Sequence, residues 1–557
     1  MGIERYLPKL KFVKPIGGFH GVSAVFPTLK DVIDYEENNV RINRGYPRFV
    51  THPIVKIIEN KYKKRFGAIG AISCQSYEAA IFLVVDFFFR KGNKIYFDEG
   101  VPLESYNILN EKFPNHVTKT QELADANILF MQTQGEKFQS DVKGKTVVGV
   151  LEDNNLEEDV KNLGFNIILC HDKKHDIGII LIFSIRYAML DILRRHCGFN
   201  VSSRKLIKKI RSSSELAKGY EHKLRKRIAD LEKTTPEFCF LYSSGMVAVY
   251  SSILSLISSK RGKFIVVGSL YVDTLRILET WLEKYGLPKP VFIRDNIIEN
   301  LKNSIDLNTA GVIVEIPSNP LIQLVDISEI VQISHSKGAK VIVDNTVATP
   351  YNFNPFSYGV DVVIHSTTKF LSGKNNHIGG VLLLNGEELK DRIEKFDNIT
   401  KLQMDFNDIK VLSRNIRGFE ERMEKINKNS EIVANFLNNH KLIKKVYYPT
   451  IKNDPYHLLM KKYLKGGSGL LSFVLKESTE ENAMKFYDNL LPPILKGPSL
   501  GSEKTLLCPY VMMAHYKDSK EELEQLGFDF YLMRISVGIE PVDKIIRSLE
   551  NGLKKLE

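Results

Sequence analysis

From about Ser212 onward, short apolar runs alternate with amphipathic segments. The runs that predict strands are Phe238–Tyr242, Phe264–Val267, Gly311–Glu315, Lys340–Val343 and Val360–His365. Between them, apolar positions at helical spacing predict helices, for example Glu221–Leu231, Thr274–Tyr285 and Ile327–Lys337. Strands that alternate with helices indicate an α/β fold with a mostly parallel sheet covered on both faces. Ligands of such sheets bind at the carboxyl ends of the strands.

The rest of the chain predicts two further regions. After about Asn398 the pattern changes to long helices, such as Asn415–His440, and shorter strands, which indicates a smaller α+β domain. The N-terminal part has its own strand pattern, at Ile95–Phe97, Ile128–Met131, Thr146–Leu151, Ile167–Cys170 and Ile177–Phe183. We therefore expect an N-terminal α/β region at 1–211, a large domain at 212–397 and a small C-terminal domain at 398–557.

Two short sequence similarities relate the N-terminal region to the large domain. Pro53–Phe66 followed by Gly70–Ala80 resembles Tyr220–Glu232 followed by Tyr242–Met246, and His175–Gly178 resembles His377–Gly380. One hypothesis is that the N-terminal region is a degenerate copy of the large domain. The alternative is an unrelated α/β region, and similarities this short fit it equally well.

Composition is that of an ordinary soluble protein. Of 557 residues, 43% are hydrophobic and 26% charged. The longest apolar run, Ala79–Val85, is followed by Asp86 and is too short to cross a bilayer, and the first residues carry no secretory leader. The five cysteines have no metal-type spacing, so we expect buried thiols in a reducing compartment, and hence a cytoplasmic protein without a membrane partner.

The net charge of +12 comes with basic clusters at Lys61–Arg65, Lys205–Arg211 and Lys223–Arg227. Such clusters can bind nucleic acid, but on helices they are more often solvated faces. No zinc-finger spacing or aromatic-basic pattern accompanies them, so no nucleic-acid partner is expected. A positive field also suits anionic small molecules.

Candidate chemistry centres on Lys369, which follows an apolar strand. A lysine amine can hold an aldehyde cofactor as a Schiff base. Asp344, 25 residues earlier at another strand end, could keep a pyridine nitrogen protonated. Ser366 and Thr368 flank the lysine and could bind a phosphate ester. These are the parts of a site for pyridoxal 5'-phosphate (PLP), and no metal site is expected.

Further residues fit the same site at other strand ends. Ser244-Gly245-Met246 lies at a strand-to-helix turn, where backbone N–H groups bind phosphate, although most such turns are only helix caps. Tyr271 could stack on a pyridine ring or be an ordinary core tyrosine. Asn319 could donate a hydrogen bond to the phenolate oxygen of the ring. The joint spacing of these elements favours the cofactor site.

These motifs together resemble the Cys/Met-metabolism family of PLP enzymes, which includes cystathionine γ-synthases, β- and γ-lyases and acylhomoserine sulfhydrylases. The resemblance covers about Ser212 to Glu557 and continues through Ile416–Arg422, Ser499–Gly501 and Arg534–Glu540. It implies the aspartate aminotransferase-like fold (fold type I) with PLP on Lys369 and with Asp344 and Thr346 beside the cofactor. It also implies that Arg534 grips the substrate α-carboxylate and that Ser499 lies near the substrate.

The amino end adds a second resemblance. Phe19–Thr28, Tyr35–Glu37 and Arg44–Phe49 are similar to the start of the long, fungal-type cystathionine γ-synthases. Tyr46 and Arg48 match a Tyr-x-Arg segment that binds the PLP phosphate in the neighbouring subunit's site. Whether they act in their own chain or in a partner's stays open, and a homodimer or homotetramer is expected.

The expected reaction is γ-replacement on an O-acyl-L-homoserine by L-cysteine, which gives L-cystathionine for methionine biosynthesis. Lys369 would move protons, and Tyr46 or Tyr271 would assist. Departures at Gly373–His377 and at Ser499–Ser502 leave the acceptor and the leaving group open. The alternatives are a sulfhydrylase, a cystathionine or methionine lyase, and a non-catalytic relative of the family.

Overall fold

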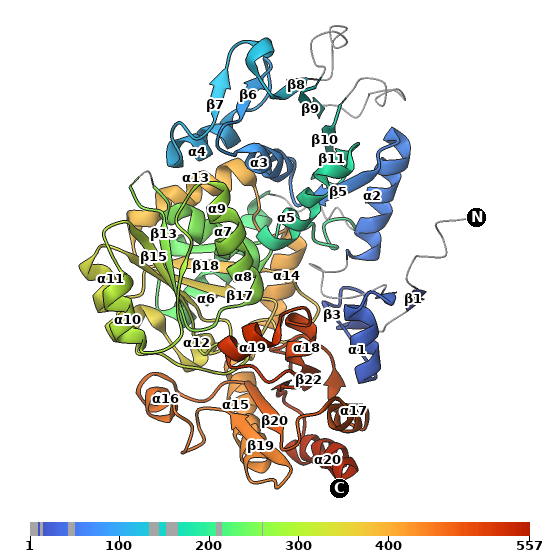
Figure 1. The fold of residues 1–557 in the computed structure, drawn as a ribbon, viewed down its shortest axis with the longest axis vertical. Helices are drawn as coiled ribbons and strands as arrows, with labels where there is room; N and C mark the ends of the chain where they lie inside the picture. Colours follow the sequence, from blue (N-terminus) through green and yellow to red (C-terminus); the bar gives the residue numbers. More distant parts are fainter. Residues whose placement is uncertain are drawn as a thin grey trace.

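The computed structural model describes residues 9–11, 15–42, 51–132, 144–151, 165–207, 214–258 and 260–557. Three units follow one another along the chain: an N-terminal unit (residues 51–207), a central unit (214–400) and a C-terminal unit (401–557). The central unit lies between the other two in Figure 1. A short N-terminal segment (residues 15–42) precedes them.

The central unit is built on a seven-stranded sheet of order β12-β18-β17-β16-β15-β13-β14. Its strands are β12 (Cys239–Tyr242), β13 (Lys263–Val267), β14 (Val291–Ile293), β15 (Thr309–Glu315), β16 (Lys340–Asp344), β17 (Val362–Ser366) and β18 (Gly380–Leu384). β18 runs antiparallel to both of its neighbours and the remaining pairs are parallel. The five predicted strands of this region are confirmed.

Helices enclose this sheet. They are α6 (Ser214–Glu232), α7 (Gly245–Leu256), α8 (Val272–Arg276), α9 (Leu282–Lys284), α10 (Ile297–Ser304), α11 (Ile327–Ser336), α12 (Thr349–Asn352) and α13 (Lys390–Thr400). β15 is buried along its whole length, and β17 is buried up to its last residue. Burial of both faces explains why these strands read as continuous apolar runs.

The N-terminal unit holds a second seven-stranded sheet, of order β5-β11-β10-β9-β8-β6-β7. Its strands are β5 (Gly70–Cys74), β6 (Lys94–Phe97), β7 (Thr118–Thr120), β8 (Ile128–Gln132), β9 (Thr146–Leu151), β10 (Ile167–Asp172) and β11 (Ile177–Ile182). The helices described in this unit are α2 (Pro53–Phe66), α3 (Tyr77–Phe88), α4 (Glu104–Lys112) and α5 (Met189–Cys197). The five strands expected here are confirmed.

The C-terminal unit is a five-stranded sheet of order β19-β20-β23-β22-β21, with helices on it. The strands are β19 (Ile443–Tyr447), β20 (Leu470–Leu475), β21 (Leu495–Lys496), β22 (Leu506–Pro509) and β23 (Met533–Ser536). The helices are α14 (Phe406–Asn415), α15 (Phe419–Asn438), α16 (His457–Tyr463), α17 (Glu480–Asp488), α18 (Tyr510–Ala514), α19 (Lys520–Leu526) and α20 (Val542–Leu553).

The long helix predicted at Asn415–His440 is present as α15, which begins four residues later than expected, at Phe419, and ends at Asn438. Asn415 itself is the last residue of α14. Gly418, the N-cap of α15, has φ of +63°, a left-handed conformation that favours glycine and that no helix interior can hold, so α15 starts after it.

The N-terminal segment shares the apolar core of the C-terminal unit, and through Phe19 and His20 it also contacts the N-terminal unit. It contains β2 (Pro15–Ile16), β3 (Ser23–Ala24), α1 (Leu29–Glu36) and β4 (Val40–Ile42), and β4 also pairs with β1 (Lys9–Lys11). The Leu29 N–H donates to Asp488 at 2.7 Å, and the Tyr487 hydroxyl donates to the Phe26 carbonyl at 3.1 Å. Phe26, Leu29 and Val32 share the apolar core of the C-terminal unit.

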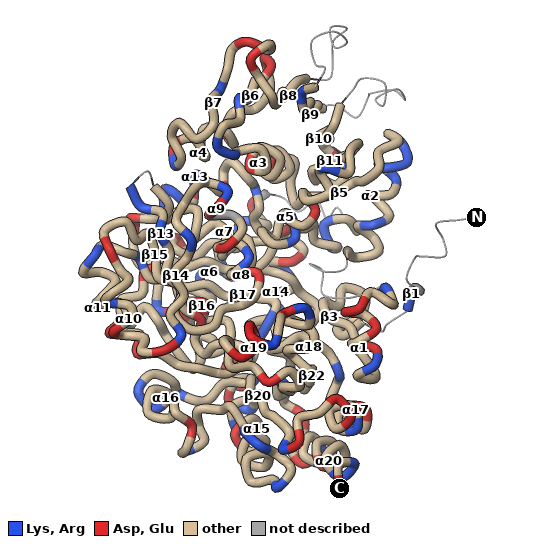
Figure 2. The backbone as a smooth tube through the Cα atoms, viewed as in Figure 1, with Lys and Arg blue, Asp and Glu red and all other residues tan. Residues whose placement is uncertain are grey.

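Charged residues of both signs are interspersed over all three units (Figure 2). The Lys61–Arg65 cluster lies on α2 and the Lys223–Arg227 cluster on α6, as expected for helix faces. On α6, Arg225 pairs with Glu221 at 2.6 Å and Arg227 pairs with Glu420 of α15 at 2.5 Å. These bridges place part of the basic charge opposite carboxylates.

All five cysteines are buried and unpaired, as predicted. In the part of the chain that the structure describes, no helix is both long and apolar enough to cross a membrane. Nor do three or more His, Cys, Asp or Glu side chains gather to hold a metal ion among the residues described.

Candidate active site

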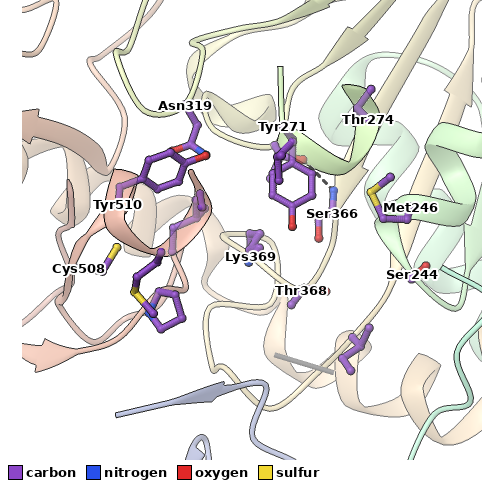
Figure 3. Close-up of a pocket in the computed structure, with 18 of the residues that line it drawn as sticks. Ser244, Met246, Tyr271, Thr274, Asn319, Ser366, Thr368, Lys369, Cys508 and Tyr510 are labelled. Atoms are coloured by element: carbon purple, nitrogen blue, oxygen red, sulfur yellow. Dashed lines mark hydrogen bonds between the residues drawn. The ribbon is translucent and has the colours of Figure 1, made fainter. Parts of the chain in front are cut away.

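A cavity of about 420 Å³ opens at the carboxyl ends of the central strands. The ends of β15, β16 and β17 form one wall, and Arg534 and Tyr510 of the C-terminal unit form another. Figure 3 shows Lys369 between Tyr271 on one side and Tyr510 on the other. The cavity therefore lies where the topology of an α/β sheet places its ligands.

Lys369 enters the cavity from the turn that follows β17. Its backbone N–H donates to the Ser366 carbonyl at 3.1 Å, and its ammonium donates to the Ser499 hydroxyl at 3.4 Å. The loop that carries Ser499 approaches the lysine backbone closely. A Cβ on Gly501 would lie 2.5 Å from the Phe370 nitrogen, and φ of Gly501 is +76°, so only glycine fits there.

Asp344 ends β16 beside the last residue of β15, Glu315. One Asp344 carboxylate oxygen accepts the backbone N–H of Thr346 at 3.0 Å. Burial raises the pKa of Asp344, which the Thr346 hydrogen bonds partly offset. Burial and the nearby Asp344 carboxylate raise the pKa of Glu315 well above its usual range. Two carboxyl groups at the base of one cavity make it receptive to a cationic ligand.

The start of α7 and the end of β17 form a small polar cradle. Ser244 caps α7 by accepting the Val247 N–H at 3.2 Å. A Cβ on Gly245 would lie 3.0 Å from Cβ of Ser366 and 3.2 Å from its hydroxyl, so a side chain at 245 would crowd this space. The Thr346 hydroxyl accepts the Ser366 N–H at 2.8 Å and joins the two strand ends. A helix N-terminus beside a hydroxyl suits a phosphate group.

Tyr271 lies at the start of α8, with its side chain in the cavity near Ser366 (Figure 3). Its backbone N–H donates to the Glu315 carboxylate at 2.8 Å, which fixes the start of the helix. The tyrosine is a cavity residue as well as a neighbour of the core, so both sequence interpretations describe part of its position.

Arg534 reaches the opposite wall from β23, where it is 3% exposed. It donates to the Asn319 side-chain oxygen at 3.0 Å and to the Ser499 carbonyl at 3.3 Å. Its guanidinium carbon lies 4.7 Å from the centre of the Tyr510 ring. Asn319 in turn donates to the Tyr510 hydroxyl at 3.2 Å. The guanidinium is thereby held as a rigid fork at the cavity surface.

The structure brings most of the predicted site residues to one cavity. Those that line it are Ser244, Gly245, Met246, Tyr271, Asn319, Asp344, Thr346, Ser366, Thr368, Lys369 and Arg534. Ser499 contacts Lys369 directly. The Thr368 hydroxyl is engaged with the backbone of Gly379 at 3.2 Å, so it supports the lysine loop from within. Tyr46 and Arg48 lie outside the described residues.

Sequence reasoning missed three parts of the wall. Tyr510 carries no motif that would have marked it, because its role depends on Arg534 and Asn319 arriving from other elements. Tyr35 and Glu36 come from α1, and residues 200–202 come from the end of the N-terminal unit. Tyr35–Glu37 was noticed as part of a family resemblance, but nothing in the sequence indicated that it faces the cavity.

Comparison with known proteins agrees with this geometry. The family model described as "Cys/Met metabolism PLP-dependent enzyme" matches residues 217–554. The chain belongs to this family. Members of it use PLP, and the α/β fold with fold-type-I structural relatives is as expected. The N-terminal unit precedes the matched region.

Relatives with different reactions match the same part of the chain. A cystathionine beta-lyase of Lactococcus lactis subsp. cremoris is 33% identical over 334 residues, which are 60% of this chain and 86% of the relative. An L-methionine gamma-lyase of Fusobacterium nucleatum is 36% identical over 337 residues, or 60% of this chain and 83% of the relative. The crystal structure of cystathionine gamma synthase from Xanthomonas oryzae in complex with cystathionine has 25% identity and a TM-score of 0.57, over 60% of this chain and 86% of that one.

The residues present fit the cofactor. Gly245 leaves room for a phosphate where a side chain would intrude, Asp344 offers a half-buried carboxylate at a strand end, and the Lys369 amine enters the same cavity. A protonated ring nitrogen would supply the positive charge that the Asp344 and Glu315 pair favours.

Proposed function

We propose that the protein catalyses γ-replacement on an O-acyl-L-homoserine with L-cysteine, which yields L-cystathionine. The crystal structure of cystathionine gamma synthase from Xanthomonas oryzae supports this reaction by its similarity in fold. Bound at Lys369, PLP would supply an electron sink for negative charge at the substrate Cα. The expected place of the reaction is the cytoplasm, in keeping with five buried, unpaired thiols.

In this proposal the residues on the two walls of the cavity have different roles. Arg534 binds the α-carboxylate of the substrate and orients Cα toward Lys369. The Lys369 amine, 3.4 Å from the Ser499 hydroxyl, accepts the Cα proton and returns protons to the reacting carbons as a general acid and base. Asp344 holds the ring nitrogen of the cofactor protonated, and Tyr271 packs beside the ring.

Two residues in the wall of the cavity, one acidic and one basic, favour cysteine as the acceptor over sulfide or water. Glu36 of α1 and Lys517 both line the cavity. Burial raises the pKa of Glu36 to about 7, and Lys517 acts against that shift. A zwitterionic amino acid is recognised by one anionic and one cationic partner, which the ionised form of Glu36 and the ammonium of Lys517 supply, whereas sulfide and water need neither. This pair is the observation on which the choice of acceptor depends.

A lyase reaction is the second candidate, because the curated relatives at 33% and 36% identity are named as lyases. Incubation with acetyl-, succinyl- or phospho-homoserine against cysteine, sulfide or no thiol, and with cystathionine or methionine alone, with products identified by mass, separates the candidates. Formation of cystathionine with at least one donor is expected. If only keto acid and ammonia form with every donor, the protein is a lyase and the γ-replacement proposal fails.

The acceptor site has its own test. The double change Glu36→Gln and Lys517→Met should raise KM for cysteine about tenfold or more, because two charge-assisted contacts are lost, while any turnover with sulfide keeps its KM. Lys520→Met, an exposed lysine of the neighbouring helix, serves as the matched control. Equal effects on cysteine and sulfide would remove the acceptor role of the pair.

A further inference from the structure

The two seven-stranded sheets have the same topology. When the strands of each sheet are numbered in chain order, both sheets read 1-7-6-5-4-2-3. In both, the seventh strand is antiparallel to its two neighbours and every other neighbouring pair is parallel. An identical order and direction for seven strands, in two consecutive parts of one chain, indicates a duplication.

The correspondence extends to single residues. Ser76 and Ser244 each follow the first strand of their sheet and cap the next helix by accepting the N–H three residues on, at 2.9 and 3.2 Å. Gly178 is the second residue of β11, and Gly380 is the first residue of β18. A Cβ on Gly178 would lie 2.5 Å from the Ser76 carbonyl oxygen, and one on Gly380 would lie 2.3 Å from that of Ser244. α3 is therefore the equivalent of α7.

The N-terminal unit has lost the groups that make the cofactor site. Ser366 pairs with Gly380 across the loop that carries Lys369, whereas its equivalent, His171, pairs with Gly178 across a short hairpin with no such loop. By the strand registers, the position of Asp344 is taken by Val150. The position of Gly245 is taken by Tyr77, whose ring stacks on His171 at 5.0 Å. The phosphate cradle of this copy is thus filled by its own side chains.

Contacts between the two units come in equivalent pairs. α3 packs on α13 as α5 packs on α7, and α4 packs on α13 as α5 packs on α8. The Ser76 hydroxyl donates to the Thr400 carbonyl at 2.5 Å, and the Ser244 hydroxyl donates to the Gly198 carbonyl at 3.0 Å, each at the end of the facing helix. Paired contacts of this kind define a pseudo-twofold axis, as at the interface of a symmetric dimer.

The equivalent residues Phe82 and Tyr250 meet at this axis. Their rings lie edge to face, with centroids 6.4 Å apart. One continuous apolar core extends across the contact, from Ile72 to Leu402. At its edge, Lys284 pairs with Asp86 of the N-terminal unit at 2.9 Å, and the two side chains are 5% and 1% exposed. The contact between the two units is therefore as apolar and as well buried as the core of a subunit interface.

The N-terminal unit also supports the active site directly. Residues 200–202 line the cavity. Arg204 donates to the Asp408 carboxylate at 2.9 Å and to the Asn376 carbonyl, which belongs to the loop between Lys369 and β18. Asp408 is buried on α14, with its side chain 3% exposed. Arg204 thus fastens the lysine loop and α14 to the N-terminal unit.

We propose that the N-terminal unit is a catalytically silent copy of the cofactor-binding unit that takes the place of a partner subunit within the same chain. Each chain then carries one complete site, whose wall is closed by its own N-terminal segment and its own silent copy. A homodimer or homotetramer would use other faces. The inference does not depend on which reaction the site catalyses.

The test uses full-length chains and measures PLP retention. Arg204→Glu places a carboxylate beside Asp408 and should weaken PLP binding at least tenfold, whereas Arg186→Glu, the same charge change at an exposed position of the same unit, should leave it within twofold. Differently tagged Arg204→Glu and Lys369→Ala chains are then co-expressed and purified through both tags. Sedimentation of the wild-type holoprotein gives the number of chains per particle.

If each chain completes its own site, the hybrid should bind PLP as weakly as Arg204→Glu alone. If the protein is a monomer, no hybrid should form, and a single 63.6 kDa chain should retain PLP. Recovery of wild-type affinity at one site per hybrid would mean that the silent copy acts across chains, and would overturn the proposal. So would an Arg204→Glu variant that binds PLP as tightly as Arg186→Glu, or an experimental structure in which residues 70–182 and 239–384 do not superpose strand for strand.

Discussion

Truncation of Arg534 tests how the cavity recognises its substrate. In the Arg534→Ala variant the fork above the Tyr510 ring is lost, together with its bonds to the Asn319 oxygen at 3.0 Å and the Ser499 carbonyl at 3.3 Å. The substrate α-carboxylate then loses the charge-assisted partner that the proposal assigns to it.

The size of the effect follows from that one contact. A hydrogen bond to a charged group contributes about 1.5–3 kcal/mol. At about 1.4 kcal/mol per factor of ten, KM for the amino-acid donor should rise roughly 10- to 150-fold. The kcat value should fall less, because Lys369 and Asp344 are untouched.

The assay compares steady-state kinetics on an O-acyl-L-homoserine and on its α-carboxamide. Wild type should bind the α-carboxamide more weakly than the acid. Arg534→Ala should bind the two substrates almost equally, because the substitution and the amide remove the same interaction. Arg417→Ala, an exposed arginine, is the matched control. A rise in KM of about twofold or less, or full additivity of the two losses, would contradict the carboxylate role.

Other predictions address the cofactor and pH. Lys369→Ala should lose turnover and the pyridoxyl label that borohydride fixes in wild type, whereas Lys374→Ala in the same loop should keep both; a label found on another peptide would refute the assignment. Asp344→Asn should retain PLP absorbance but lose about 100-fold or more in kcat, as on removal of one preorganised charge, and near-normal kcat would show that ring protonation does not depend on this carboxylate. Gly245→Ala should weaken PLP binding, measured by dialysis, through crowding of the phosphate cradle, and unchanged affinity would place the phosphate elsewhere. Burial raises the pKa of Asp397 from 3.8 to about 7, so the native state binds this proton more tightly than the unfolded state. Stability should therefore fall as pH rises from about 4 to 7, and urea unfolding of Asp397→Asn should lack part of this fall; parallel pH profiles would exclude the effect.

The sequence was informative where chemistry follows a strand. Lys369, Asp344 and Ser366 stand at the ends of continuous apolar runs, and parallel strands bring such ends to one edge of the sheet. Arg534 came from a family motif rather than from periodicity. Tyr510 was missed because an aromatic residue in a buried run looks like core until its neighbours in space are known.

Two other features needed the structure for different reasons. Gly418 sets the start of the helix predicted at Asn415–His440 to Phe419, although a glycine inside a helical pattern is often tolerated, so the pattern alone did not decide where the helix begins. The similarity between His175–Gly178 and His377–Gly380 was visible in the sequence. Strand order was not, because hydrophobic runs show where strands lie but not which strands pair.

Asp86 and Lys284 belong to one polypeptide, so their contact does not depend on the association of two chains. Two separate chains would need an affinity high enough to stay associated at cellular concentrations. A covalent connection replaces that requirement with an effective local concentration on the order of millimolar or higher. Substitutions at this buried pair should therefore lower the melting temperature without making the loss of activity depend on dilution. A tethered face of this kind can accumulate changes that would dissociate a freely exchanging dimer.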